Sequence, residues 1–138
     1  MNDLALIKAK INTLPVEDQK EMLDLIVELE EAKEREESRV DFLTFVKKMW
    51  PAFISGRHHE IMADAFERVA NGELKRLIIN MPPRHTKSEF ASYLFPAWFL
   101  GRYPEKKIIQ TAHTAELAVG FGRKVRNLIG QDDFQSVF

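Results

Sequence analysis

Residues 76–89 read Arg-Leu-Ile-Ile-Asn-Met-Pro-Pro-Arg-His-Thr-Lys-Ser-Glu, and this stretch decides which fold the sequence predicts. Its first six residues form a short apolar run with two central isoleucines, as a buried strand requires. A Pro-Pro turn follows, and the apolar spacing of residues 87–100 then predicts a helix that Pro96 should kink or end early. The stretch therefore predicts a strand, a loop and a helix in succession.

The residues that follow repeat this alternation. Residues 107–112, Lys-Ile-Ile-Gln-Thr-Ala, predict a second strand, and residues 114–129 predict a helix that ends at Gly130. A strand, helix, strand and helix of these lengths are typical of the opening of a parallel α/β sheet with right-handed crossovers. Because two strands cannot form a stable sheet of that kind, the predicted fold is incomplete.

The residues before position 76 predict helices only. Apolar positions at helical spacing indicate four of them, over residues 3–12, 15–39, 42–49 and 58–71. Asp41 is suited to cap the third helix, and Gly72 is well placed just past the end of the fourth. Residues 1–40 carry six basic and eleven acidic side chains, whereas residues 41–138 carry fourteen basic and ten acidic ones. This asymmetry predicts two segments with different roles.

Length and composition exclude several classes of protein. A chain of 138 residues allows one small domain and argues against two. It contains no cysteine, which excludes a disulfide scaffold, a thiolate nucleophile and a thiolate zinc site. No apolar run approaches the roughly 18 to 20 residues that cross a bilayer, and the N-terminus lacks the layout of a secretory signal. These features fit a reducing cytoplasm.

The loop between the first predicted strand and its helix lies where a phosphate-binding loop must lie. Main-chain N–H groups wrap phosphates at such a place, and the helix N-terminus adds a partial positive charge. Lys87 is placed to reach the β- and γ-phosphates, and the Ser88 hydroxyl to ligate Mg²⁺. Of the pattern G-x-x-x-x-G-K-[ST], however, only the last two residues are kept, because Met81 and Thr86 stand at the glycine positions. The residues alone leave an ordinary strand-to-helix connection with a basic surface equally open.

The segment Arg76 to Glu89 resembles the Walker A region of tailed-phage terminase large subunits, the ATPase motors that package DNA into proheads. Many of these proteins carry Met-Pro-Pro-Arg-His-Gly-Lys-Ser there, and the departure in this chain is Thr86 in place of that glycine. The resemblance extends to residues 53–59 and 71–76 before the loop and to residues 109–126 after it. Residues 41–138 therefore resemble the start of the ATPase domain.

The resemblance implies roles for individual residues. Those of the loop bind ATP: Pro82, Pro83, Arg84, His85, Thr86, Lys87 and Ser88. Ser88 is also the expected ligand of Mg²⁺, and Arg84 is the expected catalytic residue, which senses or stabilises the γ-phosphate. His58 or His59 stands near the place of the adenine-recognition element, and we take His59 as the candidate.

The resemblance also implies a fold and partners. The expected fold class is α/β, the incomplete start of a P-loop NTPase with a parallel sheet, preceded by an N-terminal helical segment. Residues 1–40 are the acidic helical segment, and residues 41–138 are the N-terminal part of the ATPase domain. The expected partners are double-stranded viral DNA, the portal protein, the terminase small subunit and further copies of the chain on the prohead. We expect no membrane partner, and a location in the cytoplasm of the infected bacterial host.

Two parts of such a motor are not found in the sequence. No acidic residue after Ser88 ends an apolar run, as the Mg²⁺-ordering aspartate of a P-loop ATPase does. The nuclease domain that follows the ATPase domain in the family is also absent. We therefore expect weak nucleotide binding at most and no turnover from this chain, although the intact motor is an ATPase and endonuclease. The alternative is a non-enzymatic interaction module, whose helices within residues 1–71 bind a partner and whose loop is vestigial.

Overall fold

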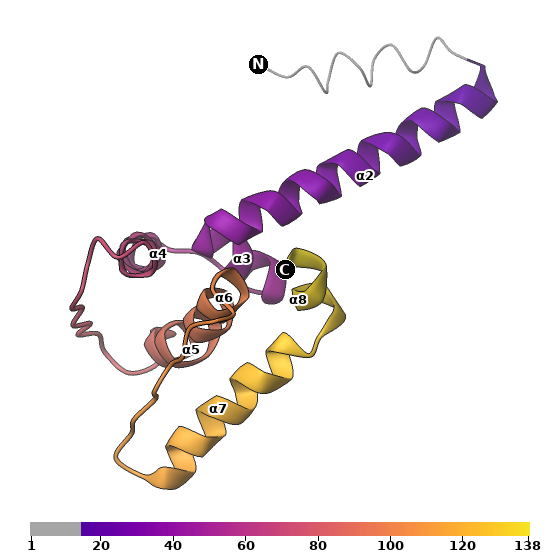
Figure 1. Ribbon diagram of the computed structural model, residues 1–138. Helices are drawn as coiled ribbons and strands as arrows, with labels where there is room; N and C mark the ends of the chain where they lie inside the picture. The colour runs from indigo at the N-terminus through magenta and orange to yellow at the C-terminus, as the bar shows by residue number, and fades with distance from the viewer. Residues whose placement is uncertain (1–14) are drawn as a thin grey trace. The chain divides into compact units, whose positions relative to one another are not determined.

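The computed structural model describes residues 15–138, and all regular secondary structure in that range is helical (Figure 1). The elements are α2 (Val16–Val40), α3 (Phe42–Met49), α4 (Arg57–Ala70), α5 (Lys87–Glu89), the π-helical turn η1 (Phe90–Leu94), α6 (Phe95–Arg102), α7 (Ala115–Ile129) and α8 (Asp132–Val137). Contacts divide the chain into two units, residues 1–34 and residues 35–138. The helix predicted over residues 3–12 lies outside the described residues.

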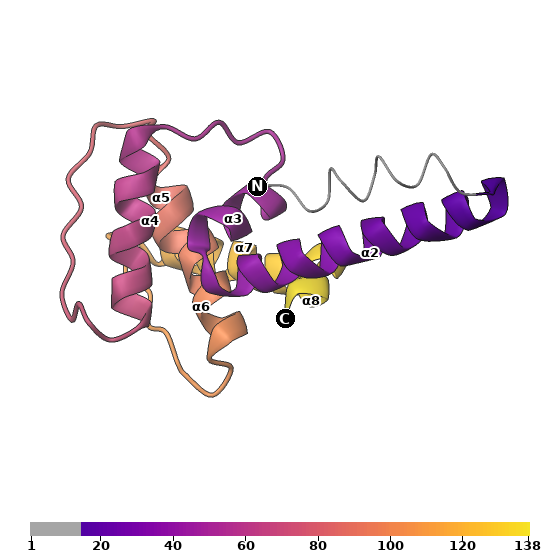
Figure 2. The ribbon, with the colours of Figure 1, turned by 90° about the horizontal axis from the view of Figure 1, so that it is seen from above.

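The predicted α/β fold class is wrong, because residues 15–138 contain no strand and no sheet. The two expected strands, 76–81 and 107–112, lie in irregular connections, of which the one from α4 to α5 is the long trace in Figure 2. The physical reason is that a strand is stabilised by hydrogen bonds to a neighbouring strand, which local sequence cannot supply. Leu77 and Ile79 pack against the helical core, whereas Ile78 is 86% exposed and Ile109 is 90% exposed.

The helices of residues 35–138 pack around the ring of Phe42, which is fully buried. Five aromatic rings surround it with centroids 5.3–6.4 Å away, namely Phe45, Phe66, Phe90, Phe95 and Trp98. These rings come from α3, α4, η1 and α6, so one side chain joins four elements. Phe42 forms edge-to-face pairs with Phe66 and with Phe90. Such pairs stabilise a fold by more than the burial of their apolar surface alone.

The start of α3 is held by two carboxylates. The Asp41 side chain accepts a hydrogen bond from the Thr44 main-chain N–H, as the sequence predicts for an N-cap residue. Glu67 of α4 accepts a hydrogen bond from the Phe42 N–H at 2.8 Å. Two of the N–H groups that a helix start leaves without helical acceptors are thereby satisfied, and α4 is fixed against α3.

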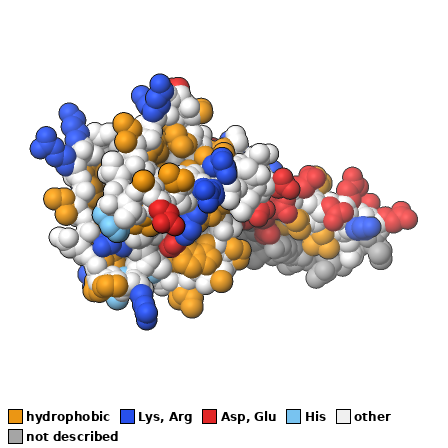
Figure 3. Space-filling model, turned by 90° about the horizontal axis from the view of Figure 1, so that it is seen from below, with side chains coloured by type: hydrophobic (Ala, Val, Ile, Leu, Met, Phe, Trp, Pro, Cys, Tyr) orange, Lys and Arg blue, Asp and Glu red, His pale blue; other side chains and the backbone are white. Residues whose placement is uncertain are grey.

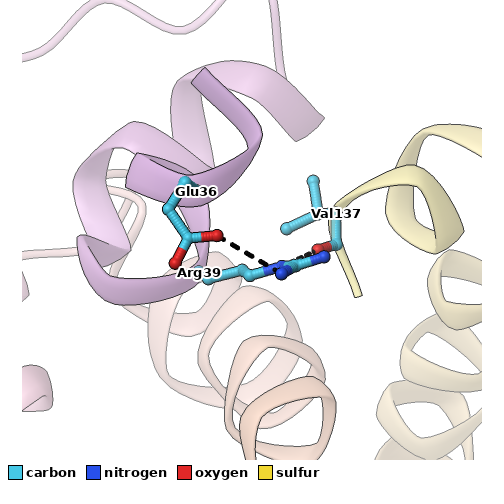
Figure 4. Close-up of polar contacts among 3 residues, drawn as sticks. All are labelled: Glu36, Arg39 and Val137. Carbon is cyan, nitrogen blue, oxygen red and sulfur yellow. Dashed lines mark hydrogen bonds and ion pairs between the residues drawn. The ribbon is translucent and has the colours of Figure 1, made fainter. Parts of the chain in front are cut away.

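The C-terminal turn of α2 belongs to the same unit as the core. The indole Nε1 of Trp98 donates a hydrogen bond to the Ser38 carbonyl at 3.0 Å, and both residues are fully buried. Arg39 donates from Nε to the Val137 carbonyl, and its Nη1 lies 3.3 Å from a Glu36 carboxylate oxygen (Figure 4). Residues 36–39 are therefore tied both to α6 and to α8.

Four helices were predicted at nearly their observed bounds: α2, α3, α4 and α7. The helix from Lys87 was also predicted, but it continues through Pro96 and Gly101 to Arg102 instead of ending at residue 100. Pro96 is preceded by the π-helical turn η1, which accommodates a break in the regular hydrogen-bond pattern. The short helix α8 was not predicted.

Residues 15–34 comprise most of α2, and they combine exposed apolar side chains with many acidic ones. Leu23, Leu25 and Leu29 are each about half exposed or more. Acidic side chains gather along α2 in Figure 3. Among the described residues, every helix is too short or too polar to span a bilayer.

Candidate phosphate-binding site

The loop before α5 contains two non-glycine residues in the left-handed region of backbone space. Arg84 has φ 65°, and Thr86 has φ 57° and ψ 5°. This region is uncommon for residues with a β-carbon, and β-branched threonine adopts it less readily than most. Thr86 stands directly before Lys87, at the position where the resemblance places a glycine. The loop thus adopts at Thr86 the conformation that glycine takes without strain.

Helical structure begins at Lys87, immediately after the left-handed residue. α5, η1 and α6 follow one another without a gap from Lys87 to Arg102. The N–H groups of the first turn have no helical acceptor, and a left-handed residue followed by a right-handed one turns successive N–H groups toward one side. Together they form a concave group of main-chain donors of the kind that binds anions.

The loop encloses a hollow of about 560 Å³ that is lined by the nine consecutive residues 81–89. Lys87 is partly buried at its edge and Ser88 is exposed, whereas Arg84 is exposed without a described hydrogen bond or ion pair. The structure therefore brings Lys87, Ser88 and Arg84 to one hollow.

Neighbouring groups restrain both sides of this hollow. On the loop itself, His85 Nδ1 donates to the Pro83 carbonyl at 2.9 Å. At the helix start, the Glu89 carboxylate lies 3.1 Å from the Lys124 ammonium group of α7. The Lys124 charge is thus partly neutralised by Glu89, which leaves Lys87 and Arg84 as the cations that line the hollow.

His59 reaches the loop from α4. The residue is 6% exposed, and its Nε2 lies 2.6 Å from the Thr86 hydroxyl oxygen. Its Nδ1 accepts a hydrogen bond from the Gly56 N–H at 2.9 Å. Both ring nitrogens are therefore engaged by the protein, which leaves neither of them for recognition of a base. Sequence reasoning missed the His59–Thr86 contact, because 27 positions separate the residues and no local pattern links them.

Three imidazole rings lie close together beside the loop. The ring centroids of His58 and His59 are 3.8 Å apart, and those of His58 and His85 are 5.9 Å apart. Burial lowers the pKa of His59 below its usual value, and the charges of His58 and His85 lower it further. His59 is therefore favoured as a neutral ring in the folded chain.

No group of three or more His, Cys, Asp or Glu side chains within residues 15–138 is arranged to hold a metal ion. A Mg²⁺ ion bound through Ser88 would draw most of its ligands from phosphate oxygens and water, as this ion commonly does. The chain matches no family model, no curated protein and no solved structure.

Proposed function

We propose that residues 81–89 bind the phosphates of a nucleotide, and that the chain is the N-terminal ATP-binding part of a phage DNA-packaging motor. The observation that carries the proposal is the left-handed Thr86 directly before Lys87 and Ser88 at the start of a helix. Residues 81–89 line one hollow, and a left-handed residue directly before a helix start is the kind of backbone arrangement in which successive N–H groups converge on an anion. The motor role rests on the resemblance of the same residues to the Walker A region of terminase large subunits.

Each side chain has one role in this proposal. Lys87 neutralises the β- and γ-phosphates, Ser88 ligates Mg²⁺ and Arg84 contacts the γ-phosphate. The main-chain groups of Pro83 to Thr86 surround the phosphates. In the intact motor, hydrolysis of ATP would drive DNA movement, with the portal protein and the terminase small subunit as partners. We expect this chain alone to bind weakly and not to turn over, because no acidic residue after Ser88 ends an apolar run, as the Mg²⁺-ordering aspartate of a P-loop ATPase does.

Thermal unfolding with and without Mg²⁺-ATP tests the phosphate site, because a ligand that binds only the folded chain raises its melting temperature. We expect stabilisation of the wild-type chain that disappears in Lys87→Ala. Lys47→Ala is the matched control, since it removes the same charge from an exposed position on α3. No shift at millimolar ATP, or an equal loss in both variants, would contradict the proposal. Substantial ATP hydrolysis that Lys87→Ala abolishes would contradict the absence of turnover.

The DNA that follows codon 138 tests the motor role separately. An open frame that encodes an apolar strand ending in Asp-Glu, and then a carboxylate-rich domain, would support it. A stop codon with no such frame nearby would contradict it, even if the loop binds phosphate.

The second candidate function is an interaction module, and the exposed apolar side chains of α2 favour it. Leu25 and Leu29 are 49% and 67% exposed, and they lie beside an excess of acidic side chains that would suit a basic partner. The two candidates make opposite predictions for the thermal experiment, since an interaction module gains no stability from ATP.

A further inference from the structure

A directed chain of hydrogen bonds connects α4 to the phosphate loop. The Gly56 N–H donates to His59 Nδ1, so the neutral ring carries its proton on Nε2. That Nε2–H donates to the Thr86 hydroxyl oxygen at 2.6 Å, and the Thr86 hydroxyl donates onward to the His85 carbonyl at 2.6 Å. Each donor in this series of three hydrogen bonds has one acceptor, and the direction of the bonds fixes the tautomer of His59.

The ring of His59 is itself held by the helical core. It contacts Phe53 edge-to-face, with centroids 4.7 Å apart, and its centroid lies 5.2 Å from that of Phe90. Phe90 is fully buried beside Phe42. Phe53 and Phe90 also contact each other, with centroids 5.5 Å apart, so the three rings pack as one cluster. Movement of His59 would disturb that packing, and the ring is therefore held in place beside the loop.

Thr86 needs such support because its backbone conformation is unfavourable. A β-branched residue at φ 57° pays a conformational cost that glycine does not pay. The bonds to His59 and to the His85 carbonyl both use the Thr86 hydroxyl, so they fix the side chain and the adjoining peptide together. Without them, right-handed or extended conformations of Thr86 become favourable, and the N–H groups around the hollow no longer converge.

We propose that His59 is a positioning residue of the phosphate loop, which through the Thr86 hydroxyl holds the left-handed turn that a glycine would adopt unaided. The consequence for binding rests on the proposed function of residues 81–89, whereas the effect on the loop does not. The contact between His59 and Thr86 thus stabilises the left-handed conformation that a glycine at position 86 would adopt without support, and the shape of the loop depends on α4.

A measurement without ligand tests the positioning directly. At positive φ the amide proton of a residue lies close to its own Hα, which gives a strong cross-relaxation signal in the NMR spectrum of the full chain. We expect this signal for Thr86 in the wild type and in Thr86→Ser, and its loss in His59→Ala. His59→Phe keeps an aromatic ring against Phe53 and Phe90 but cannot donate to Thr86, so it serves where the alanine variant does not fold. An unchanged signal in His59→Phe would overturn the proposal.

A double-mutant comparison tests the consequence for ligand binding, with Mg²⁺-ATP as the probe. We expect His59→Phe to weaken binding about tenfold in the Thr86 background, the loss of one good hydrogen bond. In the Thr86→Gly background the same substitution should cost less than about twofold, because glycine needs no support. Equal losses in both backgrounds would overturn the proposal. If the wild-type chain binds no Mg²⁺-ATP, the proposed function fails, and the ligand-free NMR signal still decides the role of His59.

Discussion

The side-chain Nε2 of Gln110 donates a hydrogen bond to the main-chain carbonyl of Ser92 at 2.8 Å. Ser92 lies four residues before Pro96, and proline has no N–H to donate to a carbonyl at that helical spacing. Gln110 therefore donates to a carbonyl to which Pro96 cannot donate. The same bond fixes residues 107–112, an irregular segment, against the π-helical turn η1.

Replacement of Gln110 by leucine should destabilise the chain. Gln110→Leu keeps the size of the side chain but leaves the Ser92 carbonyl without this donor, at a cost of about 1–3 kcal/mol. Urea unfolding measures the difference. Thr111→Val is the control, because Thr111 is exposed and its replacement should change stability by no more than about 0.5 kcal/mol. Equal midpoints for Gln110→Leu and the wild type would contradict this account.

Two glycines within helices should respond to alanine in opposite directions. A β-carbon on Gly101 of α6 would lie 2.5–2.7 Å from three ring carbons of Phe138, so Gly101→Ala should cost about 1–3 kcal/mol through overpacking. A β-carbon on Gly122 of α7 meets nothing within 4 Å, so Gly122→Ala should stabilise the chain by about 0.5–1 kcal/mol. Thermal unfolding of the two variants checks both signs. A stabilising Gly101→Ala would show that the Phe138 ring moves aside at little cost.

The stability of the chain should fall on acidification below about pH 6.5, in part through His59. Burial lowers the pKa of His59 in the folded chain, and the charges of His58 and His85 add to the effect. Between the lowered pKa and the usual one, the unfolded chain binds the proton and the folded chain does not. Stability therefore decreases as the pH falls through that range and levels off below it. Urea unfolding at several pH values should show a shallower dependence in His59→Phe than in the wild type.

Glu67 should tolerate glutamine but not alanine. Burial raises the pKa of its carboxyl group, the nearby Asp41 and Asp64 raise it further, and the Phe42 N–H and Arg102 oppose the shift. The protonated form of Glu67 is thus more favoured in the folded chain than in the unfolded chain. The stability that this preference adds is present at low pH and is lost as the pH rises above the usual pKa of glutamate.

The experiment compares two variants at neutral pH. Glu67→Gln keeps an acceptor for the Phe42 N–H and removes the charge, so its stability should equal or exceed that of the wild type by up to about 1 kcal/mol. Glu67→Ala leaves that N–H without its acceptor and should cost about 1–3 kcal/mol. Chemical unfolding measures both, and a glutamine variant as unstable as the alanine variant would contradict the argument.

The candidate site was partly predictable from the sequence. Lys87 and Ser88 at a helix start were predicted from their order after a Pro-Pro turn, because a helix N-terminus is a local feature. The left-handed Thr86 was not, since a threonine favours other conformations unless something outside the loop supports it. Its support, His59, comes from a helix that is distant in sequence.

The sequence by itself determined α2, α3, α4 and α7, and only the tertiary structure decided the conformation of the segments that connect them. The spacing of apolar residues and the Asp41 cap act within a few residues, so α3, α4 and α7 follow from local order. Residues 76–81 and 107–112 have the composition of strands, but a strand needs hydrogen bonds from a neighbour, and these segments pack instead on helices through residues such as Leu77. The fold around the loop is consequently set by contacts distant in sequence, as between Gln110 and Ser92 and between His59 and Thr86.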